Sequence, residues 1–373
     1  MNGLRVLITN CTLNTRTGTE VYVRDLAVAL CERGHTPIVY SPELGQIAEE
    51  IRERTIPVVD DLAKVSQPPD IIHAQHNLET ITALLHFPRV PAVYFFHDNL
   101  AWHDVPPKFP RILRYIAVDE TCLDRLLYEH GIQPERARVI LNSINLEMFQ
   151  PRASLPETPQ RALLFSNSSA HVEVVRTACE QTGLELDVIG AASGKFCEKP
   201  ESILGKYDLV FAKARAALEA MAVGASVVLC DMRGCGPMVT TSELSELRRL
   251  NFGHRTLRNP LEPQVIAREI ARYDAQDAAE VTKRIRSTAG LDTAVDDIIE
   301  LYKEAIEEAK AIKEDADAEM MAAANFLQKL PLREAYKAAN QKIIAYDSLA
   351  SVRWTRSVLR IPLLNAIYKK FSH

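Results

Sequence analysis

The chain has 373 residues, 47% of them apolar, which is enough for two hydrophobic cores rather than one. Its net charge of −5 argues against nucleic-acid binding, which usually goes with a basic balance. The seven cysteines lack C-x-x-C spacing, no apolar run approaches the roughly 18 residues of a membrane helix, and the N-terminus lacks the order of a signal peptide. These features predict a soluble, cytoplasmic protein with reduced thiols.

The first half alternates short apolar segments with amphipathic ones. Segment 20–35 is expected to be a helix, because Val23, Leu26 and Leu30 share one face and Gly34 stands at the expected stop. The apolar segments are rich in Val and Ile and are expected to be strands, at 4–9, 36–41, 70–75, 92–98, 114–119 and 137–142. This alternation predicts a parallel sheet with helices on both faces.

Segment 151–161 carries three prolines without apolar periodicity and is expected to be a linker. The alternation then resumes, with strands expected at 162–167, 184–190, 207–212 and 225–231. Helices dominate from about residue 261, and 296–330 is expected to be one long helical run.

We therefore predict an α/β fold of two doubly wound Rossmann-like domains, residues 1–150 and 151–290, with a helical extension over 291–373. Two such domains joined by a hinge place the site in the cleft between them, at the carboxyl ends of the strands.

The turn "TRTGTE" (15–20) follows the first strand and opens the first helix. Gly18 allows close approach of the backbone to a ligand, and the free N–H groups of a helix start favour an anion. Thr17 and Glu20 are also spaced as a capping box, which needs no ligand. From this turn alone, a phosphate or sugar contact and a purely structural cap stay equally open.

Lys213 and Arg215 follow the strand at 207–212, in the first turn of the next helix. Cations there oppose the helix dipole, which is a local cost unless an anion lies near the free N–H groups. A diphosphate would fit, because the Arg215 guanidinium could bond two of its oxygens while the Lys213 ammonium acts as a point charge. The alternative is that both side chains are simply solvated. Glu219, one turn later, either accepts from ribose hydroxyls or is an exposed helix glutamate.

Three segments together resemble family 4 glycosyltransferases of the GT-B fold: "GTEVYVRDLAVALCERGHTPIVYSP", "NSINLEMF" and "ALEAMAVGASVVLCD". They come in that family's order and span most of residues 4–235. The resemblance implies that Glu219 holds the nucleotide ribose and that the turn with Gly18 faces the donor diphosphate. It also implies that His97 lies near the transferred sugar and Asn142 at the domain junction.

The chain departs from the family pattern at two places. Phe211 stands where the first glutamate of the paired motif belongs, and "SNSSAHVE" (166–173) replaces the usual Gly-Arg and following Lys. We infer from charge that Lys213 and Arg215 replace the lost cations. Ser166 and Asn167 would still donate hydrogen bonds to phosphate or base, and Thr19 joins Gly18 among the expected donor-binding residues.

Histidines and carboxylates cluster after two neighbouring strands of the first half. The spacings are not diagnostic of a metal site, so we expect no metal. Instead, these side chains are expected to line the acceptor side of the cleft, with Trp102 as a stacking surface. The cluster consists of His73, His76, His97, Asp98, His103 and Asp104.

These observations predict a retaining, metal-independent glycosyltransferase that moves a sugar from a UDP- or GDP-sugar to a glycan, lipid-linked or other acceptor. No cofactor is expected beyond the donor substrate, and no nucleic-acid partner. Lys213 and Arg215 would stabilise the leaving diphosphate, His97 would position the sugar, and Asp98 would orient the acceptor or that imidazole. A nucleotide-sugar epimerase on the same architecture and a non-catalytic sugar-nucleotide-binding subunit are the alternatives.

From Lys329 onward, the chain carries nine basic and two acidic residues. Arg353, Arg356 and Arg360 share a helical face. A basic amphipathic segment suits peripheral contact with an anionic membrane face, and it equally suits packing onto the acidic body or a homo-oligomer contact.

Overall fold

The computed structural model describes residues 3–98, 101–190, 197, 199–330 and 341. The chain forms two compact units, Met1–Asp315 and Ala316–His373. The first unit holds two sheets, and of the second the structure describes chiefly one helix, α11 (Ala316–Lys329). Within the described residues, no helix is long and apolar enough to cross a lipid bilayer.

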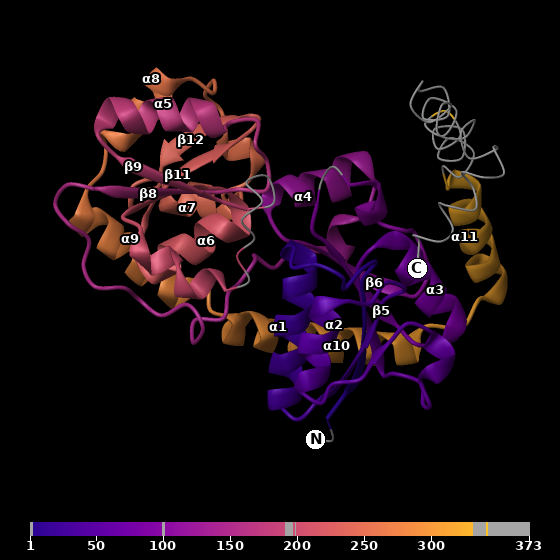
Figure 1. Ribbon diagram of the computed structural model, residues 1–373. Helices are drawn as coiled ribbons and strands as arrows, with labels where there is room; N and C mark the ends of the chain where they lie inside the picture. The colour runs from indigo at the N-terminus through magenta and orange to yellow at the C-terminus, as the bar shows by residue number, and fades with distance from the viewer. Residues whose placement is uncertain (1–2, 99–100, 191–196, 198, 331–340, 342–373) are drawn as a thin grey trace, which may run out of the picture. The chain divides into compact units, whose positions relative to one another are not determined.

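The first sheet is wholly parallel and has seven strands in the order β3-β2-β1-β4-β5-β6-β7 (Figure 1). Its strands are β1 (Arg5–Thr9), β2 (Thr36–Tyr40), β3 (Val58–Val59), β4 (Ile71–Ala74), β5 (Ala92–Phe96), β6 (Ile112–Ala117) and β7 (Ala137–Val139). The helices that alternate with them are α1 (Gly18–Glu32), α2 (Gln46–Glu53), α3 (Asn77–His86) and α4 (Glu120–Asp124), the last continued by a π-helical turn at Arg125–Glu129. The predicted strands and the parallel alternation are confirmed here; only the two-residue β3 was not expected.

The second sheet has five strands in the order β12-β11-β10-β8-β9. Its strands are β8 (Arg161–Phe165), β9 (Glu185–Ile189), β10 (Leu209–Ala212), β11 (Ser226–Asp231) and β12 (Gly234–Met238), and its helices are α5 (Val172–Thr182), α6 (Ala214–Val223), α7 (Leu244–Arg249), α8 (Pro263–Ile270) and α9 (Ala275–Thr288). The first four strands pair in parallel, as expected, while β12 pairs antiparallel with β11. This edge strand was not predicted, because "GCGPM" has neither alternation nor β-branched residues.

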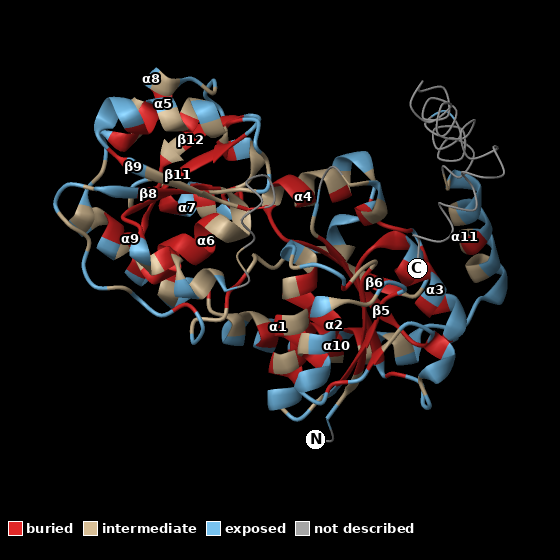
Figure 2. Ribbon diagram, viewed as in Figure 1, coloured by how far each residue is buried: buried red, intermediate tan, exposed pale blue. Residues whose placement is uncertain are grey.

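The cores explain why these segments become strands and helices. The inner strands β1, β4, β5, β6, β10 and β11 are almost wholly buried, because helices cover both of their faces, whereas the edge strands β7 and β9 are partly exposed (Figure 2). One core lies under α1 and also contains Val295, Ile298 and Tyr302 of α10 (Leu291–Ala311). Helix α10 therefore returns to the first sheet. The second sheet has a core on each face, one of which contains Phe211. The predicted boundaries at residues 150 and 290 stay a prediction.

The expectation of one helical run over 296–330 is wrong. Helix α10 ends at Ala311 and α11 begins at Ala316, so Asp315 precedes a helix rather than lying inside one. The sequence "IKEDAD" (312–317) is polar, and little apolar surface holds it in a helix. The basic tail after Lys329 lies almost wholly outside the described residues, so its membrane or subunit contact stays untested.

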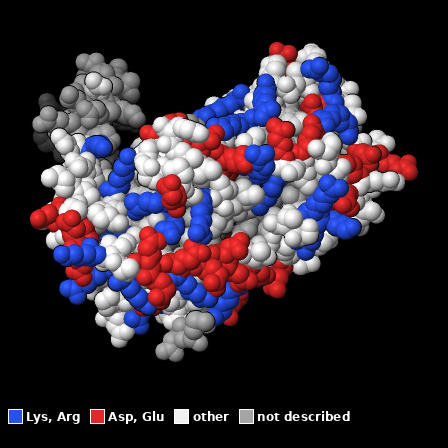
Figure 3. All heavy atoms as spheres, turned by 180° about the vertical axis from the view of Figure 1, so that it is seen from behind, with Lys and Arg blue, Asp and Glu red and all other residues white. Residues whose placement is uncertain are grey.

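Lys and Arg side chains are interspersed with Asp and Glu over the face drawn in Figure 3, rather than gathered into one basic patch. The expectation that nucleic acid is not a partner stays a prediction.

Candidate functional site

The loops that follow the carboxyl ends of the strands carry strained backbone. Four non-glycine residues there have positive φ angles: His76 (59°), Ala214 (50°), Asn251 (50°) and Phe252 (52°). The Ala214 N–H donates to the Phe252 carbonyl at 2.9 Å, which ties the start of α6 to the loop after α7. Because such conformations persist only where the surroundings impose them, they mark this edge of the sheets as a site.

Lys213 lies at the N-cap of α6 and pairs with Asp231, at the end of β11. The Lys213 ammonium is 2.7 Å from a carboxylate oxygen of Asp231 and 3.0 Å from Nε2 of His254. Burial and the nearby ammonium lower the pKa of His254, so its neutral imidazole accepts from Lys213. Burial alone would raise the pKa of Asp231, but the Lys213 bond outweighs it and lowers that pKa.

Arg215 bridges two buried carboxylates. Its guanidinium lies 2.6 Å from Asp25 on α1 and 2.8 Å from Glu219, one turn later on α6. All three side chains are largely buried, with 17%, 6% and 8% of their surface exposed for Arg215, Asp25 and Glu219. The alternatives of a solvated Arg215 and an exposed Glu219 are therefore wrong. Cations at the start of a helix were expected to need a nearby anion. For Arg215, the carboxylates of Asp25 and Glu219 supply that negative charge.

The turn before α1 keeps space open at the site. A Cβ added to Gly18 would meet no atom within 4 Å. The capping box, one of the two interpretations of this turn, is not formed, since the Thr17 hydroxyl donates to the Glu20 carboxylate and no side chain caps the helix N–H groups. The start of α1 is thus left without a side-chain cap next to open space, which favours the ligand interpretation of this turn.

Two cavities meet at Gly18 and Arg215. The larger, here called the outer cavity, measures about 750 Å³. Its described lining residues are Gly18, Asp98, Ala101, Phe165, Ser166, Asn167, Ser168, Lys213, Ala214, Arg215, Ala216, Cys230, Asp231, Met232, Arg233 and His254. The inner cavity measures about 320 Å³ and is lined by Thr17, Gly18, Thr19, Tyr22, His97, Asp98, His103, Asp104, Asn142, Ala214, Arg215 and Asn251. A third space, about 170 Å³, reaches Glu219, Asn167 and Gly18.

The structure therefore brings every residue expected to bind the donor or to act in catalysis to the lining of one of these three spaces. Lys213, Arg215, Gly18, Ser166 and Asn167 line the outer cavity. His97, Asp98, Thr19 and Asn142 line the inner one, and Glu219 the third.

Asp104 is the most buried carboxyl group of the inner cavity, with none of its surface exposed. One of its oxygens accepts the Asp98 backbone N–H, and the other, Oδ1, has no hydrogen-bond partner. Burial raises the pKa of Asp104 to about 8, so the group is largely protonated at neutral pH. Burial also lowers the pKa of His97 to about 4, so its imidazole is neutral.

Two expectations for the histidine cluster need correction. His73 is fully buried within β4, stacked on Phe95, with Nδ1 2.6 Å from the Tyr302 hydroxyl. It belongs to the core and cannot line a cleft. Trp102 is 53% exposed and is not among the lining residues of the three spaces, so nothing here places it against a sugar.

Cys11, His76 and His103 place their ligand atoms within 4.8 Å of one another, a spacing that could hold a metal ion. The hydrogen bonding argues against it. The Cys11 backbone N–H donates to Nδ1 of His76 at 2.9 Å, so the ring proton of the neutral imidazole resides on Nε2. A protonated nitrogen cannot bind a metal, whereas a ligating histidine usually donates its other N–H.

Sequence reasoning missed four residues of the site: Asp25, Asp231, Arg233 and His254. Asp231 could have been found, because it ends the predicted strand next to the one that precedes Lys213. Asp25 and His254 lie far from their partners along the chain and carry no local signal.

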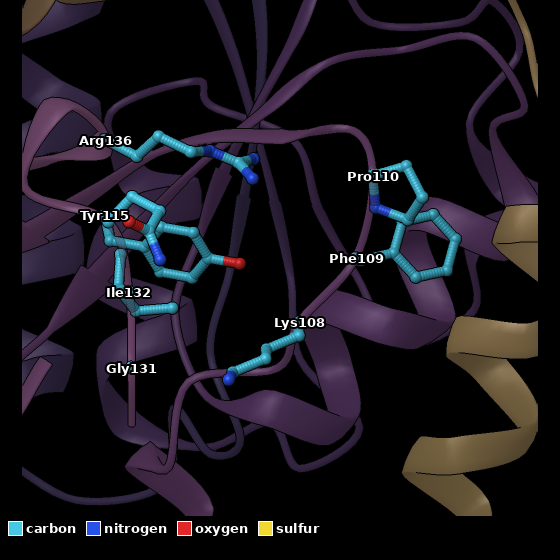
Figure 4. Close-up of a pocket in the computed structure, with 8 residues that line it drawn as sticks. Lys108, Phe109, Pro110, Tyr115, Gly131, Ile132 and Arg136 are labelled. Atoms are coloured by element: carbon cyan, nitrogen blue, oxygen red, sulfur yellow. The ribbon is translucent and has the colours of Figure 1, made fainter. Parts of the chain in front are cut away.

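A separate cavity of about 290 Å³ lies beside β6, and Figure 4 shows Lys108, Tyr115, Ile132 and Arg136 around it. The Arg136 guanidinium lies 5.7 Å from the centre of the Tyr115 ring, whose hydroxyl donates to the Pro107 carbonyl. None of its described lining residues borders the outer or inner cavity, so Lys108 offers a control position.

Residues 16–148 match the sequence model described as Glycosyltransferase Family 4. Through this segment, the chain is similar to glycosyltransferase family 4. The predicted resemblance is thereby confirmed.

Solved structures share the fold of this chain. A glycosyltransferase from Rickettsia africae ESF-5 is 14% identical, with a TM-score of 0.62 over 82% of this chain and 99% of that one. HepE from Anabaena, in complex with UDP and glucose, is 18% identical, with a TM-score of 0.60 over 80% and 99%. A putative UDP-N-acetylglucosamine 2-epimerase from Listeria monocytogenes is 14% identical, with a TM-score of 0.52 over 84% and 99%. Among curated proteins, none matches the chain. The predicted GT-B fold is confirmed.

Proposed function

We propose that this protein is a family 4 glycosyltransferase that transfers a sugar, with retention of configuration, from a nucleoside-diphosphate sugar to a glycan or lipid-linked acceptor. UDP-sugar is the donor we favour, since HepE was solved with UDP. The observation that carries the proposal is the outer cavity, where Lys213, Arg233 and His254 gather beside Ser166 and Asn167 at the carboxyl edge of the second sheet.

A diphosphate fits the chemistry of the outer cavity. Lys213 bonds Asp231 and His254, yet it stays one-third exposed, so phosphate oxygens can reach it. Arg233 adds a second cation on the turn after β11. The hydroxyls of Ser166 and Ser168, which line the same cavity, are neutral donors. Hydrogen bonds from charged donors to phosphate are the strong ones, so these groups would stabilise a departing diphosphate.

The reaction requires charge stabilisation more than a protein nucleophile. As the bond from the sugar to the diphosphate breaks, negative charge builds on the phosphate oxygens. Lys213 and the N–H groups near Gly18, which line the same cavity, would stabilise that charge. The departing phosphate takes the proton of the acceptor hydroxyl. We propose that these cations make the reaction metal-independent, which activity in the presence of excess chelator would support and its loss would refute.

Glu219 retains a role toward the ribose. Arg215 contacts one carboxylate oxygen, Oε1, which leaves Oε2 to accept from a ribose hydroxyl. In this proposal Arg215 holds Glu219 and meets the diphosphate only through its remaining N–H groups.

A thermal-shift panel of UDP-, GDP-, ADP- and dTDP-sugars tests the donor, because a ligand that binds only the folded state raises the melting temperature. We expect the largest rise with a UDP-sugar. If none of the four classes raises the melting temperature, the donor site is wrong.

Incubation with the stabilising donor then separates the transferase from its alternatives. Slow release of free sugar and UDP supports a transferase that uses water in place of its acceptor. Conversion to an epimeric donor indicates the epimerase, which shares the fold and therefore is not distinguished by it. Binding without any turnover, with acceptor extracts also present, indicates a non-catalytic subunit, for which Phe211 in place of the first glutamate is the supporting observation.

A further inference from the structure

The cavity beside β6, here called the β6 cavity, differs in charge from the other three spaces. It is lined by Lys108 and Arg136 together with Phe109, Tyr115 and Ile132 (Figure 4). No acidic residue is among its described lining residues, whereas the outer, inner and third cavities each have carboxyl groups in their linings. Positive charge thus gathers around this cavity without negative charge from its walls.

Both cations are without a carboxylate partner in the part of the chain that the structure describes. Lys108 is exposed and makes no ion pair there. Nη2 of Arg136 donates to the Ile112 carbonyl, and no described residue bonds its Nε or Nη1. The Tyr115 hydroxyl is not a counter-ion, because burial raises its pKa to about 12 and it donates to the Pro107 carbonyl. A bound anion would balance the two positive charges.

The fold itself positions the two cations. The Arg136 guanidinium lies 5.7 Å from the centre of the Tyr115 ring and is anchored to the start of β6 by its bond to Ile112. The Lys108 ammonium lies close to Gly131, 3.6 Å from the point that a Cβ there would occupy. Gly131 has a positive φ of 61°, so a larger residue at this position would be strained. Groups that are already oriented lose little entropy when they bind a ligand.

The β6 cavity lies apart from the carboxyl edge of the sheets. Its lining segments, 108–110 and 131–136, precede β6 and β7, so the cavity lies toward the amino ends of these strands. None of its described lining residues borders the outer, inner or third cavity. A ligand here would therefore occupy a site separate from the proposed donor site.

The walls of the β6 cavity select the body of the ligand. Phe109, Tyr115 and Ile132 are at most 7% exposed and present aromatic and aliphatic surface. The cavity measures about 290 Å³, and about 150 Å³ of apolar space is enough for benzene. A sugar ring would leave most of its hydroxyls without partners on such walls. The charges select the other end of the ligand, since a guanidinium forms its strongest hydrogen bonds with carboxylate and phosphate groups.

We propose that the β6 cavity binds a small organic anion. Its carboxylate or phosphate group bonds Lys108 and Arg136, and its flat apolar body packs against Phe109, Tyr115 and Ile132. The two anionic groups share the chemistry that these residues recognise, and the experiment below separates them. The inference does not rest on the proposed function, because it concerns a different cavity.

Fluorine NMR titrations of the full chain test the inference with three probes: 4-fluorobenzoate, 4-fluorophenyl phosphate and 4-fluorobenzamide. The amide has nearly the shape of the benzoate but carries no charge. We expect at least one of the two anions to bind about tenfold or more tightly than the amide. Tighter binding of the benzoate identifies a carboxylate ligand, and tighter binding of the phenyl phosphate identifies a phosphate ligand.

Three variants locate the bound anion. Arg136→Met should weaken binding of the better anion about tenfold, because the side chain nearly keeps its length and loses its charge. Lys108→Ala should weaken it several-fold and leave the melting temperature unchanged, since this exposed side chain has no described partner. Arg138→Met is the matched control: Arg138 lies on β7, pairs with Glu304 and does not line the cavity, so the affinity should equal that of the wild type.

Equal affinity of the wild type for the anions and the amide overturns the inference. So does wild-type affinity in folded Arg136→Met and in Lys108→Ala, because the anion then binds elsewhere. An equal loss of affinity in Arg138→Met overturns it too, since only net charge would then matter. If Arg136→Met does not fold, Lys108→Ala and Arg138→Met decide the question together.

Discussion

The protonation of Asp104 makes a prediction that needs no ligand. Folded, this carboxyl group has a pKa of about 8, because burial disfavours its charged form. In the unfolded chain, the pKa of this carboxyl group should be about 3.9. Between these values the folded chain holds a proton that the unfolded chain has lost. The free energy of unfolding therefore falls as pH rises through this window, by up to about 1.4 kcal/mol per pH unit.

Asp104→Asn removes this slope, since an amide does not titrate. Between pH 5 and 7.5, the unfolding free energy of the wild type minus that of the variant should fall by about 3 kcal/mol. The difference cancels the titration of groups common to both proteins. Other charged or titratable groups near Asp104 include Asp98 and His97.

Urea unfolding followed by circular dichroism at several pH values measures this difference, with Asp297→Asn as the matched control at an exposed position. The control should run parallel to the wild type. If the curves for Asp104→Asn and the wild type are also parallel, Asp104 titrates normally and the account of the inner cavity loses its protonated carboxyl group.

Two further substitutions test the rest of the site. Arg215→Met should lower the free energy of unfolding, measured by urea denaturation, by about 3 kcal/mol, because Glu219 would stay buried without its cation. Asp25 would still pair with Arg24. No measurable change in the free energy of unfolding would show that Arg215 does not hold Glu219 as described. Gly18→Ala should leave the melting temperature nearly unchanged, since a Cβ there meets no atom within 4 Å, yet weaken UDP binding in calorimetry several-fold. Unchanged affinity would place the ligand elsewhere.

The fold could be predicted from the sequence because strands that are buried on both faces of a sheet consist of short runs of Val, Ile and Leu. The exceptions are instructive. Strand β12 contains Gly234, Gly236 and Pro237, and it forms only because a tight turn returns it to the edge of β11. The helix break before Ala316 was missed because each neighbouring residue tolerates a helix, while too few apolar side chains hold one.

The sequence predicted site residues most directly where they follow the end of a strand. Lys213 and Asp98 follow β10 and β5, and the structure brings them to one cavity. His73 was misplaced because it also looks like a strand end, yet β4 continues to Ala74 and turns the imidazole into the core. The pairing of Arg215 with Asp25 joins residues 190 positions apart, which no local pattern reveals.

The central claim is that a nucleoside diphosphate binds in the outer cavity against Lys213. Calorimetric titration of UDP into the wild type, Lys213→Ala and Lys108→Ala tests it most directly, because the last variant removes a lysine from a cavity that shares no described residue with the site. We predict that Lys213→Ala binds UDP about 10- to 100-fold more weakly and that Lys108→Ala binds as the wild type does. Equal affinity in all three proteins would contradict the account.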